Sequence, residues 1–350
     1  MRKPKLKKDA PIAVTLFSAG GGIEGGLVGA GIRPVASVDC DPNNKIFSRQ
    51  MKFCRDANYQ CYGGESYLAT VEEMASKDFP GIPRNPFLLH ASPVCSSFSS
   101  LSHLTRRREG DTDISAAKAT ATAIATLQPQ WFTLENAVKY YPSKSCRIII
   151  DALIEHNYDF VTRDIDMADW GVPQNRERLI LVARKNAPVL GKVFLPRKER
   201  RGWDSCIEGF AMPRSRLTNL LKAQKKSVLS KSLETDFKMA IIQRGGVCTG
   251  SGHPKSKNKS ILRMEGEPSF TITRSMFIDS KGGSRSGAIT YWDNLSQEAY
   301  QLPMRVIARI GGFPEWYRLP DRDAIAGSII GLSVPPYFAK QLFLNLLAQN

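Results

Sequence analysis

The segment Ile12–Gly31, IAVTLFSAGGGIEGGLVGAG, indicates the fold of this chain. Its first residues, Ile12–Phe17, are apolar or β-branched and predict a buried strand. Three consecutive glycines, Gly20–Gly22, come next, and Ile23–Ala30 has a helical pattern that ends at Gly31. A strand, a glycine loop and a helix open a nucleotide-binding βαβ unit, in which glycines let the backbone approach a ligand at the helix amino terminus. The segment therefore predicts an α/β fold with a ligand site at this loop.

A second predicted strand, Pro34–Val38, ends in Asp39-Cys40-Asp41, so that an acid follows the glycines by about 20 residues, where a bound ribose needs an acceptor. No Gly-Lys-Ser/Thr follows the loop, so it is not a phosphate-binding P-loop. The pattern favours an adenosine-type cofactor without a pyrophosphate contact. Glu65, in the turn after a weak third strand, is a further candidate near the cofactor's base, and a surface turn explains it equally well.

The segment Phe87–His103, FLLHASPVCSSFSSLSH, carries a candidate nucleophile. Its apolar start predicts a strand buried on both faces, and Pro93 ends that strand because proline cannot donate to the sheet. Cys95 therefore follows the carboxyl end of a strand, where open α/β sheets bind ligands. Taken alone, Cys95 is better explained as an ordinary buried cysteine, so a catalytic role depends on the rest of the chain.

A carboxylate and two arginines occupy comparable positions later in the chain. Trp131–Leu134 predicts a strand that ends at Glu135. Arg176 and Arg178 precede the predicted strand Leu179–Ala183 and, two residues apart, point to one side of it. Such a pair suits bidentate binding of phosphate or of another planar polar group, and two solvated arginines are the alternative.

The net charge of +16 is concentrated in two segments. Residues 184–285 hold 22 Lys and Arg against 8 Asp and Glu, a net charge of +14, and residues 1–9 have a net charge of +4. Residues 1–10 are therefore interpreted as a basic flexible arm. Within the larger basic segment the hydrophobic periodicity weakens, and Ser269–Thr273 is the one strand that it indicates. A localised excess of this size predicts a polyanionic partner, since neutralised phosphates release counterions, and a solvated cationic surface is the alternative.

The cysteine pattern and the hydropathy indicate in which cellular compartment the protein is found. The seven cysteines are odd in number and form no Cys-x-x-Cys pair, which predicts a reduced, cytoplasmic protein without a structural zinc site. No apolar segment approaches the ~20 residues of a membrane span, and the first ten residues lack the apolar core of a signal peptide. We therefore expect a soluble protein without a membrane partner.

Seven motifs in this order resemble those of the DNA cytosine-5 methyltransferases: LFSAGGG (16–22), SPVCSSFS (92–99), LEN (134–136), PQNRER (173–178), PSFTIT (268–273), GGFPEWYRLP (311–320) and GLSVPPYFA (331–339). The resemblance covers nearly the whole chain. It implies an α/β fold, with a Rossmann-like S-adenosylmethionine-dependent methyltransferase sheet in a catalytic and cofactor-binding domain (11–185). A smaller target-recognition domain, mostly β-strands and loops (186–287), and a C-terminal segment that packs back on the catalytic domain (288–350) would follow.

The resemblance also implies roles for the matching residues. Cys95 matches the nucleophile, which adds to carbon 6 of cytosine and makes carbon 5 reactive. Glu135 matches the acid near ring nitrogen 3. Arg176 and Arg178 match paired arginines that hold the base's carbonyl oxygen, the DNA backbone or the carboxylate. The methyl donor would be S-adenosylmethionine. Its implied binding residues are Phe17, Ala19, Gly20, Gly21, Gly22, Asp39, Cys40, Glu65, Pro93, Ser333 and Val334.

The leading hypothesis is a sequence-specific, monomeric DNA cytosine-5 methyltransferase, acting alone or beside a restriction endonuclease for the same site. Its target cytosine would swing out of the duplex to reach Cys95. Two alternatives stay open. An RNA cytosine methyltransferase would use the same scaffold, and basic charge does not distinguish the two nucleic acids. A catalytically silent DNA-binding relative is suggested by departures from the family motifs at Ala19, Val94, Ala137 and Leu332.

Overall fold

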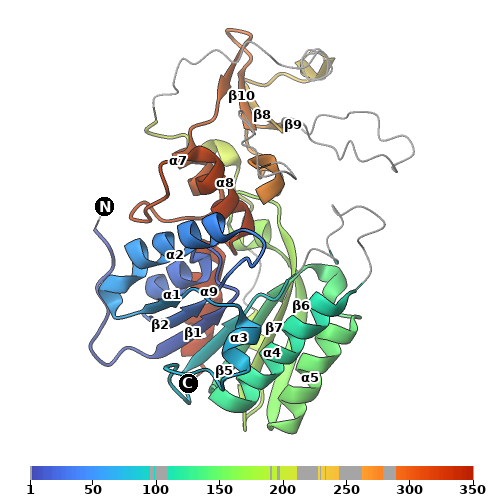
Figure 1. The fold of residues 1–350 in the computed structure, drawn as a ribbon. Helices are drawn as coiled ribbons and strands as arrows, with labels where there is room; N and C mark the ends of the chain where they lie inside the picture. The colour runs from blue at the N-terminus through green and yellow to red at the C-terminus, as the bar shows by residue number, and fades with distance from the viewer. Residues whose placement is uncertain are drawn as a thin grey trace.

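The computed structural model describes residues 2–94, 98, 109–189, 191–194, 198–210, 228, 230–232, 234–243, 262–278 and 289–349. Two β-sheets organise this part of the chain (Figure 1). One sheet has seven strands in the order β3-β2-β1-β4-β5-β7-β6, and the other has four in the order β11-β10-β8-β9. Cys95 and much of the basic segment lie outside the described residues.

The seven-stranded sheet is mostly parallel. Its parallel strands are β1 (Ile12–Leu16), β2 (Arg33–Val38), β3 (Glu65–Tyr67), β4 (Leu88–Ala91) and β5 (Trp131–Asn136). Strand β7 (Glu177–Lys185) lies antiparallel between β5 and β6 (Tyr158–Asp166). Strands β4 and β5 are buried along their whole length, as expected of parallel strands with helices on both faces. The predicted α/β class with a large, Rossmann-like sheet is confirmed.

The third strand is one place where the expected order of elements was wrong. The stretch before Gly63 contains no strand but helix α2 (Lys45–Tyr59) and a 3-10 turn at Gln60–Tyr62. Phe47 and Met51 are four residues apart and both buried, so the apolar residues of α2 recur with a helical period and form one buried side. Strand β3 begins only after the turn and contains Glu65 itself.

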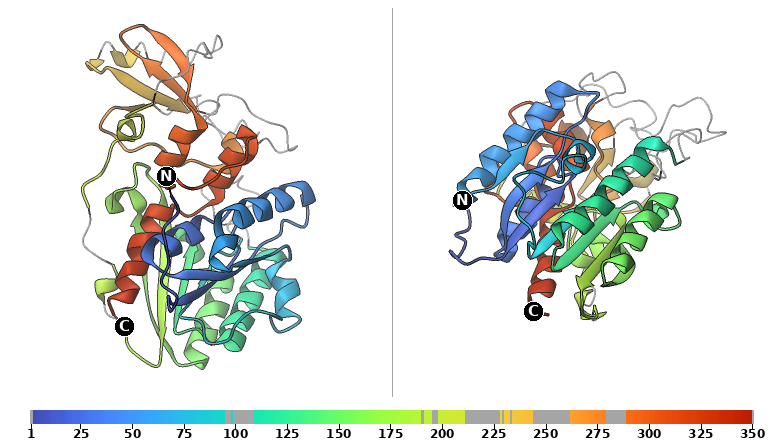
Figure 2. Two further views of the ribbon diagram at one scale, coloured as in Figure 1. Left: turned by 90° about the vertical axis from the view of Figure 1, so that its left-hand side faces the viewer. Right: turned by 60° about the horizontal axis from the view of Figure 1, so that its bottom comes forward.

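Helices cover both faces of the large sheet (Figures 1 and 2). One face packs on α3 (Val71–Ala75), α4 (Asp111–Leu127) and α5 (Lys144–Glu155), and the other packs on α1 (Gly22–Ala30) and α9 (Pro336–Leu347). Helices α1 and α9 approach closely, since a Cβ atom at Gly26 would overlap Ala339. Helix α2 instead shares an apolar core with α7 (Met304–Ile310) and α8 (Asp323–Leu332).

The smaller sheet is antiparallel throughout and lies beyond one end of the large domain (Figure 2). Its strands are β8 (Met239–Gln243), β9 (Leu262–Met264), β10 (Ile289–Asp293) and β11 (Glu298–Gln301). Two of these strands follow position 287, so the sheet takes residues from both sides of the domain boundary that we predicted there.

The predicted strand Ser269–Thr273 is not a strand, and this expectation was wrong. Ser269 forms an isolated bridge with Gln174. The polar groups of the segment bind the PQNRER motif: Ile272 N donates to Gln174 Oε1 (3.0 Å), and Thr271 Oγ1 donates to Asn175 O (2.6 Å). Because these groups are satisfied by a loop of the large domain, the segment joins the two sheets instead of extending one.

Residues 2–10, which we interpreted as a flexible arm, lie along the large domain in the structure. Lys3 Nζ donates to Ala57 O (2.8 Å) and Asn58 O (2.9 Å). These carbonyl groups belong to the last turn of α2, where a cation is favoured by the helix dipole. Tyr62 OH donates to Pro4 O (2.8 Å). The positive charge of Lys3 is therefore used inside the protein.

The described residues contain neither a membrane-spanning helix nor a cluster of metal ligands. No helix among them is long and apolar enough to span a bilayer. In the same residues, no group of three His, Cys, Asp or Glu side chains is arranged to hold a metal ion.

Candidate active site

Several predicted site residues lie at the carboxyl edge of the large sheet. Phe17 follows β1, Asp39 follows β2, Pro93 follows β4 by two residues, and Glu135 is the penultimate residue of β5. Strands β1 and β4 are neighbours, but the helix after β1 packs on one face of the sheet and α4 packs on the other. Such a switch point is where open α/β sheets bind ligands.

The loop after β1 has an unusual backbone. Phe17 and Ala19 have φ angles of 57° and 46°, in the left-handed region that costs an L-residue about 1–2 kcal/mol. Ala19 N donates to Asp39 Oδ2 (2.5 Å), so the loop after β1 is attached to the end of β2. Ala19 stands where the resembling motif has glycine, and the surrounding structure must stabilise its conformation.

The three glycines of this loop also let other segments of the protein approach its backbone. A Cβ atom at Gly20 would overlap Ile329 of α8. A Cβ atom at Gly22 would lie 2.6 Å from Ser333 Cβ and 2.6 Å from Val334 O. A side chain at either position would therefore displace α8 or the residues that follow it. The same contacts place Ser333 and Val334, both buried, directly on the loop.

Asp39 is half-buried and lies near a second acid, the buried Glu24. Burial raises the pKa of the Asp39 carboxyl, and the nearby Arg55 guanidinium opposes this shift. Burial likewise raises the pKa of Glu24, whose Oε1 accepts a hydrogen bond from Thr15 Oγ1 (2.6 Å). Arg55 is fully buried and is the positive charge that both carboxyls face.

Two other predicted cofactor residues lie less centrally. Cys40 is half-buried, and its Sγ lies 3.7 Å from Ser48 Oγ. Glu65 is exposed at the amino end of β3, paired in register with Ala36, and its Oε2 accepts a hydrogen bond from Tyr67 OH (3.0 Å). Tyr67 is instead the residue at the carboxyl end of β3, and its carbonyl oxygen accepts a hydrogen bond from Asp39 N (3.4 Å). The structure does not bring Glu65 to this edge.

Glu135 and Arg178 form an ion pair at the end of β5. Arg178 Nε lies 2.8 Å from Glu135 Oε1, and the side chains are 20% and 10% exposed, respectively. The antiparallel pairing of β5 with β7, in which Glu135 is opposite Ile180, brings the two side chains together. The guanidinium therefore orients one carboxylate oxygen of Glu135.

Arg176 does not join this pair, although two arginines two residues apart were expected to point to one side of the strand. It is buried, and its Nη1 lies 3.3 Å from the carbonyl oxygens of Ile272 and Gly331. Its backbone N–H donates to Asp166 Oδ1 (2.9 Å), before β7 begins. Arg176 therefore connects the PSFTIT segment, the end of α8 and the large sheet.

The chain that leads to Cys95 is attached to the sheet by two residues that sequence reasoning missed. Asn136 Nδ2 donates to Pro93 O (3.1 Å). His90 contacts Thr133 Oγ1 through Nδ1 and Ser92 Oγ through Nε2, both at 2.9 Å. Burial lowers the pKa of His90 to about 3, so the ring is neutral near pH 7. The signals were available, since Asn136 directly follows Glu135 and His90 interrupts an apolar run.

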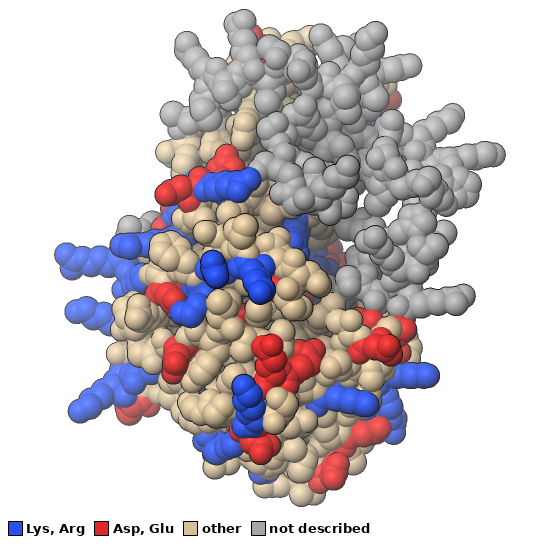
Figure 3. Space-filling model, viewed as in Figure 1, with Lys and Arg blue, Asp and Glu red and all other residues tan. Residues whose placement is uncertain are grey.

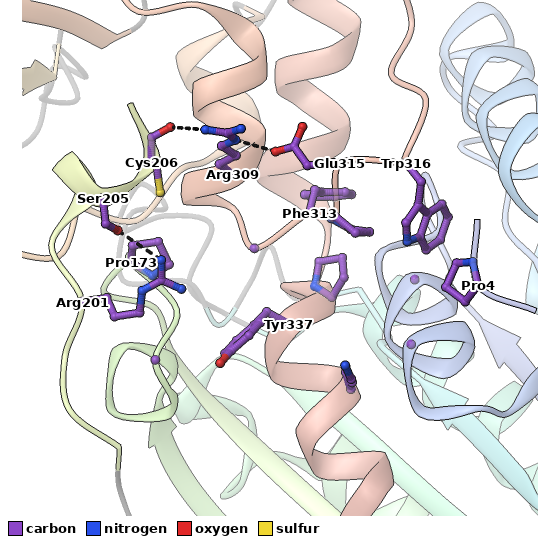
Figure 4. Close-up of a pocket in the computed structure, with 17 residues that line it drawn as sticks. Pro4, Pro173, Arg201, Ser205, Cys206, Arg309, Phe313, Glu315, Trp316 and Tyr337 are labelled. Carbon is purple, nitrogen blue, oxygen red and sulfur yellow. Dashed lines mark hydrogen bonds and ion pairs between the residues drawn. The ribbon is translucent and has the colours of Figure 1, made fainter. Parts of the chain in front are cut away.

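A cavity of about 620 Å³ lies elsewhere, between α9, α1 and the segments 201–206 and 312–316 (Figure 4). Tyr337 and Arg201 lie toward one side of it, and Trp316 and Pro4 lie toward the other. Arg309, which donates to Glu315 Oε1 and to the carbonyl of Cys206, forms its upper wall in this view. None of the predicted site residues that the structure describes lines this cavity.

Comparison with known proteins adds the family. A model described as "C-5 cytosine-specific DNA methylase" matches residues 13–348. The chain is similar to the type II methyltransferase M1.HphI of Haemophilus parahaemolyticus, with 20% identity over 358 residues that cover 96% of this chain and 87% of that protein. It is also similar to the type II methyltransferase M.XorII of Xanthomonas oryzae pv. oryzae, with 30% identity over 187 residues. That match covers 51% of this chain and less than half, 42%, of M.XorII.

Solved structures show the same fold. The Dnmt2 methyltransferase of S. pombe has a TM-score of 0.64 at 18% identity, over 97% of this chain and 99% of that chain. A DNA modification methyltransferase encoded within an E. coli prophage has a TM-score of 0.58 at 16% identity, over 97% and 99%. Both likenesses extend over the large sheet and the smaller one.

Proposed function

Because this chain belongs to the C-5 cytosine-specific DNA methylase family, we propose that it transfers a methyl group from S-adenosylmethionine to carbon 5 of cytosine in double-stranded DNA. The single observation that carries the proposal is the arrangement at the end of β5. There Glu135 is oriented by Arg178, and the adjacent Asn136 binds the carbonyl of Pro93, two residues before Cys95. One short strand end thus links the candidate acid to the candidate nucleophile.

In this proposal the Cys95 thiolate adds to carbon 6 of a flipped-out cytosine and forms a covalent bond to the ring. The Glu135 carboxyl stabilises the resulting negative charge through ring nitrogen 3, in the orientation that Arg178 imposes. Carbon 5 would then take the methyl group, and the sulfur of the donor would leave as a neutral thioether. A base removes the carbon 5 proton, and the Cys95 thiolate leaves as the double bond forms again.

His90 and Asn136 position the residues that precede Cys95. The neutral ring of His90 holds Ser92, and Asn136 holds Pro93. The family motif usually has proline immediately before the nucleophile, whereas this chain has Val94, which restricts the backbone less. The two hydrogen bonds compensate by fixing the residues just before it.

The residues at the ends of β1 and β2 fit S-adenosylmethionine. Asp39 is half-buried at the end of β2, where a carboxylate can accept hydrogen bonds from ribose hydroxyls. The loop at Phe17–Ala19 lies beside Asp39, because the Ala19 N–H donates a hydrogen bond to the Asp39 carboxylate. Bound there, the cofactor would supply an electrophilic methyl group. Phe17, Cys40 and Pro93 would border its site.

The basic segment and the four-stranded sheet would read the DNA. On the face in Figure 3, Lys and Arg are interspersed with Asp and Glu over the described surface of the large domain. The net charge of +14 in residues 184–285 therefore favours this segment for phosphate contacts.

We propose a cytoplasmic monomer. The names of M1.HphI and M.XorII as type II methyltransferases suggest a restriction endonuclease with the same recognition site as its partner.

The test is covalent trapping on duplex DNA that contains 5-fluorocytosine, with S-adenosylmethionine present. Fluorine at carbon 5 cannot leave as a proton does, so the wild-type protein should remain attached to the DNA. Cys95→Ser should form no adduct while still binding DNA. An adduct with fluorinated RNA alone would establish the RNA enzyme instead. DNA binding without an adduct in the wild type would establish a silent relative.

Asp39→Asn is expected to weaken S-adenosylmethionine binding by about 10- to 100-fold, the usual value of hydrogen bonds to a charged group. Because burial raises the Asp39 pKa, the wild-type carboxyl loses its charge at a higher pH than a free aspartate. Wild-type affinity should therefore fall as the pH decreases through that raised pKa, and the affinity of the variant should not follow this titration. Titration calorimetry at several pH values measures both effects.

Asp56→Asn is the control, because it removes a carboxylate from a surface ion pair with Lys52 on α2. It should bind S-adenosylmethionine as the wild type does. Equal affinity of the wild type and Asp39→Asn at neutral pH would remove Asp39 from the site.

A further inference from the structure

Three side chains from outside the loop between β1 and α1 hold consecutive carbonyl oxygens of that loop. Arg55, Tyr317 and Tyr59 donate, in that order, to the carbonyl oxygens of residues 19, 20 and 21. The first two bonds measure 2.6 and 2.5 Å. We call these three side chains the carbonyl clamp. They act on the loop that the proposed function assigns to the methyl donor.

The clamp is inaccessible to water. Arg55, Tyr317 and Tyr59 are 0%, 1% and 4% exposed. Burial raises the pKa of both phenols well above their usual range, so each hydroxyl keeps its proton and donates it to the loop. In a dry environment an unpaired carbonyl is costly, so the bonds to the carbonyl oxygens of residues 19 and 20 constrain the loop strongly. The carbonyl oxygen of Gly21 also accepts from Gly25 N (3.2 Å), and Tyr59 adds a second bond there.

The clamp comes from two elements outside the large sheet. Arg55 and Tyr59 lie on α2, whereas Tyr317 lies in the GGFPEWYRLP segment between α7 and α8. That segment is itself attached to α2, since Arg318 N donates to Asn58 Oδ1 (2.8 Å) and Tyr317 OH lies 3.0 Å from Cys54 Sγ. The GGFPEWYRLP motif, which has no role in the proposed catalytic steps, thus contacts the glycine loop through Tyr317.

Holding the carbonyl oxygens also sets the direction of the N–H groups. In a trans peptide the C=O and N–H groups point in opposite directions, and the chain has no cis peptide among its described residues. The N–H groups of residues 20–22 therefore point away from the clamp, at the amino terminus of α1. The clamp also surrounds Ala19, whose left-handed conformation persists only where neighbouring groups enforce it.

We propose that Tyr59 and Tyr317 are positioning residues for the methyl donor. They contact the loop and not the donor, and they maintain the loop conformation in which Ala19 N–H meets Asp39. The inference rests on the proposed function, because it takes S-adenosylmethionine as the ligand of this loop. Without a phenol hydroxyl, the loop should leave this conformation and bind the donor less tightly.

The experiment removes one hydroxyl at a time, with Tyr59→Phe and Tyr317→Phe in the full chain. Tyr158→Phe is the matched control: Tyr158 is also buried, and its OH donates to Pro129 O (2.6 Å) at the amino edge of the sheet. We measure the Kd for S-adenosylmethionine by calorimetry, the thermal midpoint, and amide hydrogen exchange in residues 17–23. Steady-state assays add KM and kcat.

All three variants should lose comparable thermal stability, because each loses one buried hydrogen bond. Only Tyr59→Phe and Tyr317→Phe should raise the Kd and KM for S-adenosylmethionine, each by about 10-fold, with kcat unchanged at saturation. Only these two should speed exchange in residues 17–23. If they lose stability but bind the donor as tightly as Tyr158→Phe, the clamp is purely structural and the inference is overturned. If the wild type itself binds no S-adenosylmethionine, the proposed cofactor fails, and the positioning role fails with it.

Discussion

Glu135→Gln is expected to lower kcat by about 10²- to 10⁴-fold, the usual contribution of a positioned acid. Glutamine keeps the shape of the side chain but cannot transfer a proton or take a carboxylate's charge. The expected loss concerns the step in which charge develops on the ring, so the Kd for S-adenosylmethionine should not change. Steady-state kinetics with saturating DNA and donor, together with calorimetry, separate the two quantities.

Glu155→Gln provides the control, because Glu155 is the last residue of α5 and is exposed. Its kcat should equal that of the wild type. A Glu135→Gln enzyme with wild-type kcat would show that another group stabilises the ring, and the pair with Arg178 would then be structural.

Arg176→Met is expected to reduce the free energy of unfolding by about 2–4 kcal/mol, since it removes a buried charged donor from two carbonyl groups. Methionine fills much of the same space but leaves the carbonyl oxygens of Ile272 and Gly331 without this partner. Urea unfolding of the purified variant measures the loss. The effect should be large because Arg176 connects three segments of the chain.

Arg178→Met is the comparison within the same motif. Arg178 is partly exposed and contacts Glu135, so its loss should reduce stability less than the loss of Arg176 and reduce kcat more. Equal stability losses in the two variants would contradict the inference that Arg176 is structural and that Arg178 orients Glu135.

The fold class and the family could be predicted because they depend on local patterns and motif order. Buried strands, a glycine loop and an acid after β2 are readable from neighbouring residues, and both predictions are confirmed. The DNA cytosine-5 methyltransferase class is likewise confirmed at the level of the family. The recognition of a particular DNA sequence and the adduct at Cys95 stay predictions.

Contacts between distant segments could not be predicted in this way. Arg176 and Arg178 are two residues apart and look equivalent, but the carbonyl groups that hold Arg176 come from Ile272 and Gly331. Nothing near the glycine loop in the sequence indicates that Ile329 of α8 and Tyr59 of α2 pack against it. The PSFTIT segment has the residue types of a strand, and only its hydrogen bonds to Gln174 and Asn175 remove it from a sheet.

The close contact of α1 with α9 has a consequence for biosynthesis. The ribosome releases α9 after all seven strands of the large sheet, and until then the apolar surface that α9 covers, beside Gly26 of α1, is exposed. The nascent chain must therefore carry an exposed apolar surface throughout most of its translation, a state that favours aggregation and recruits chaperones. The large domain can complete its core only when residues 336–347 have left the exit tunnel.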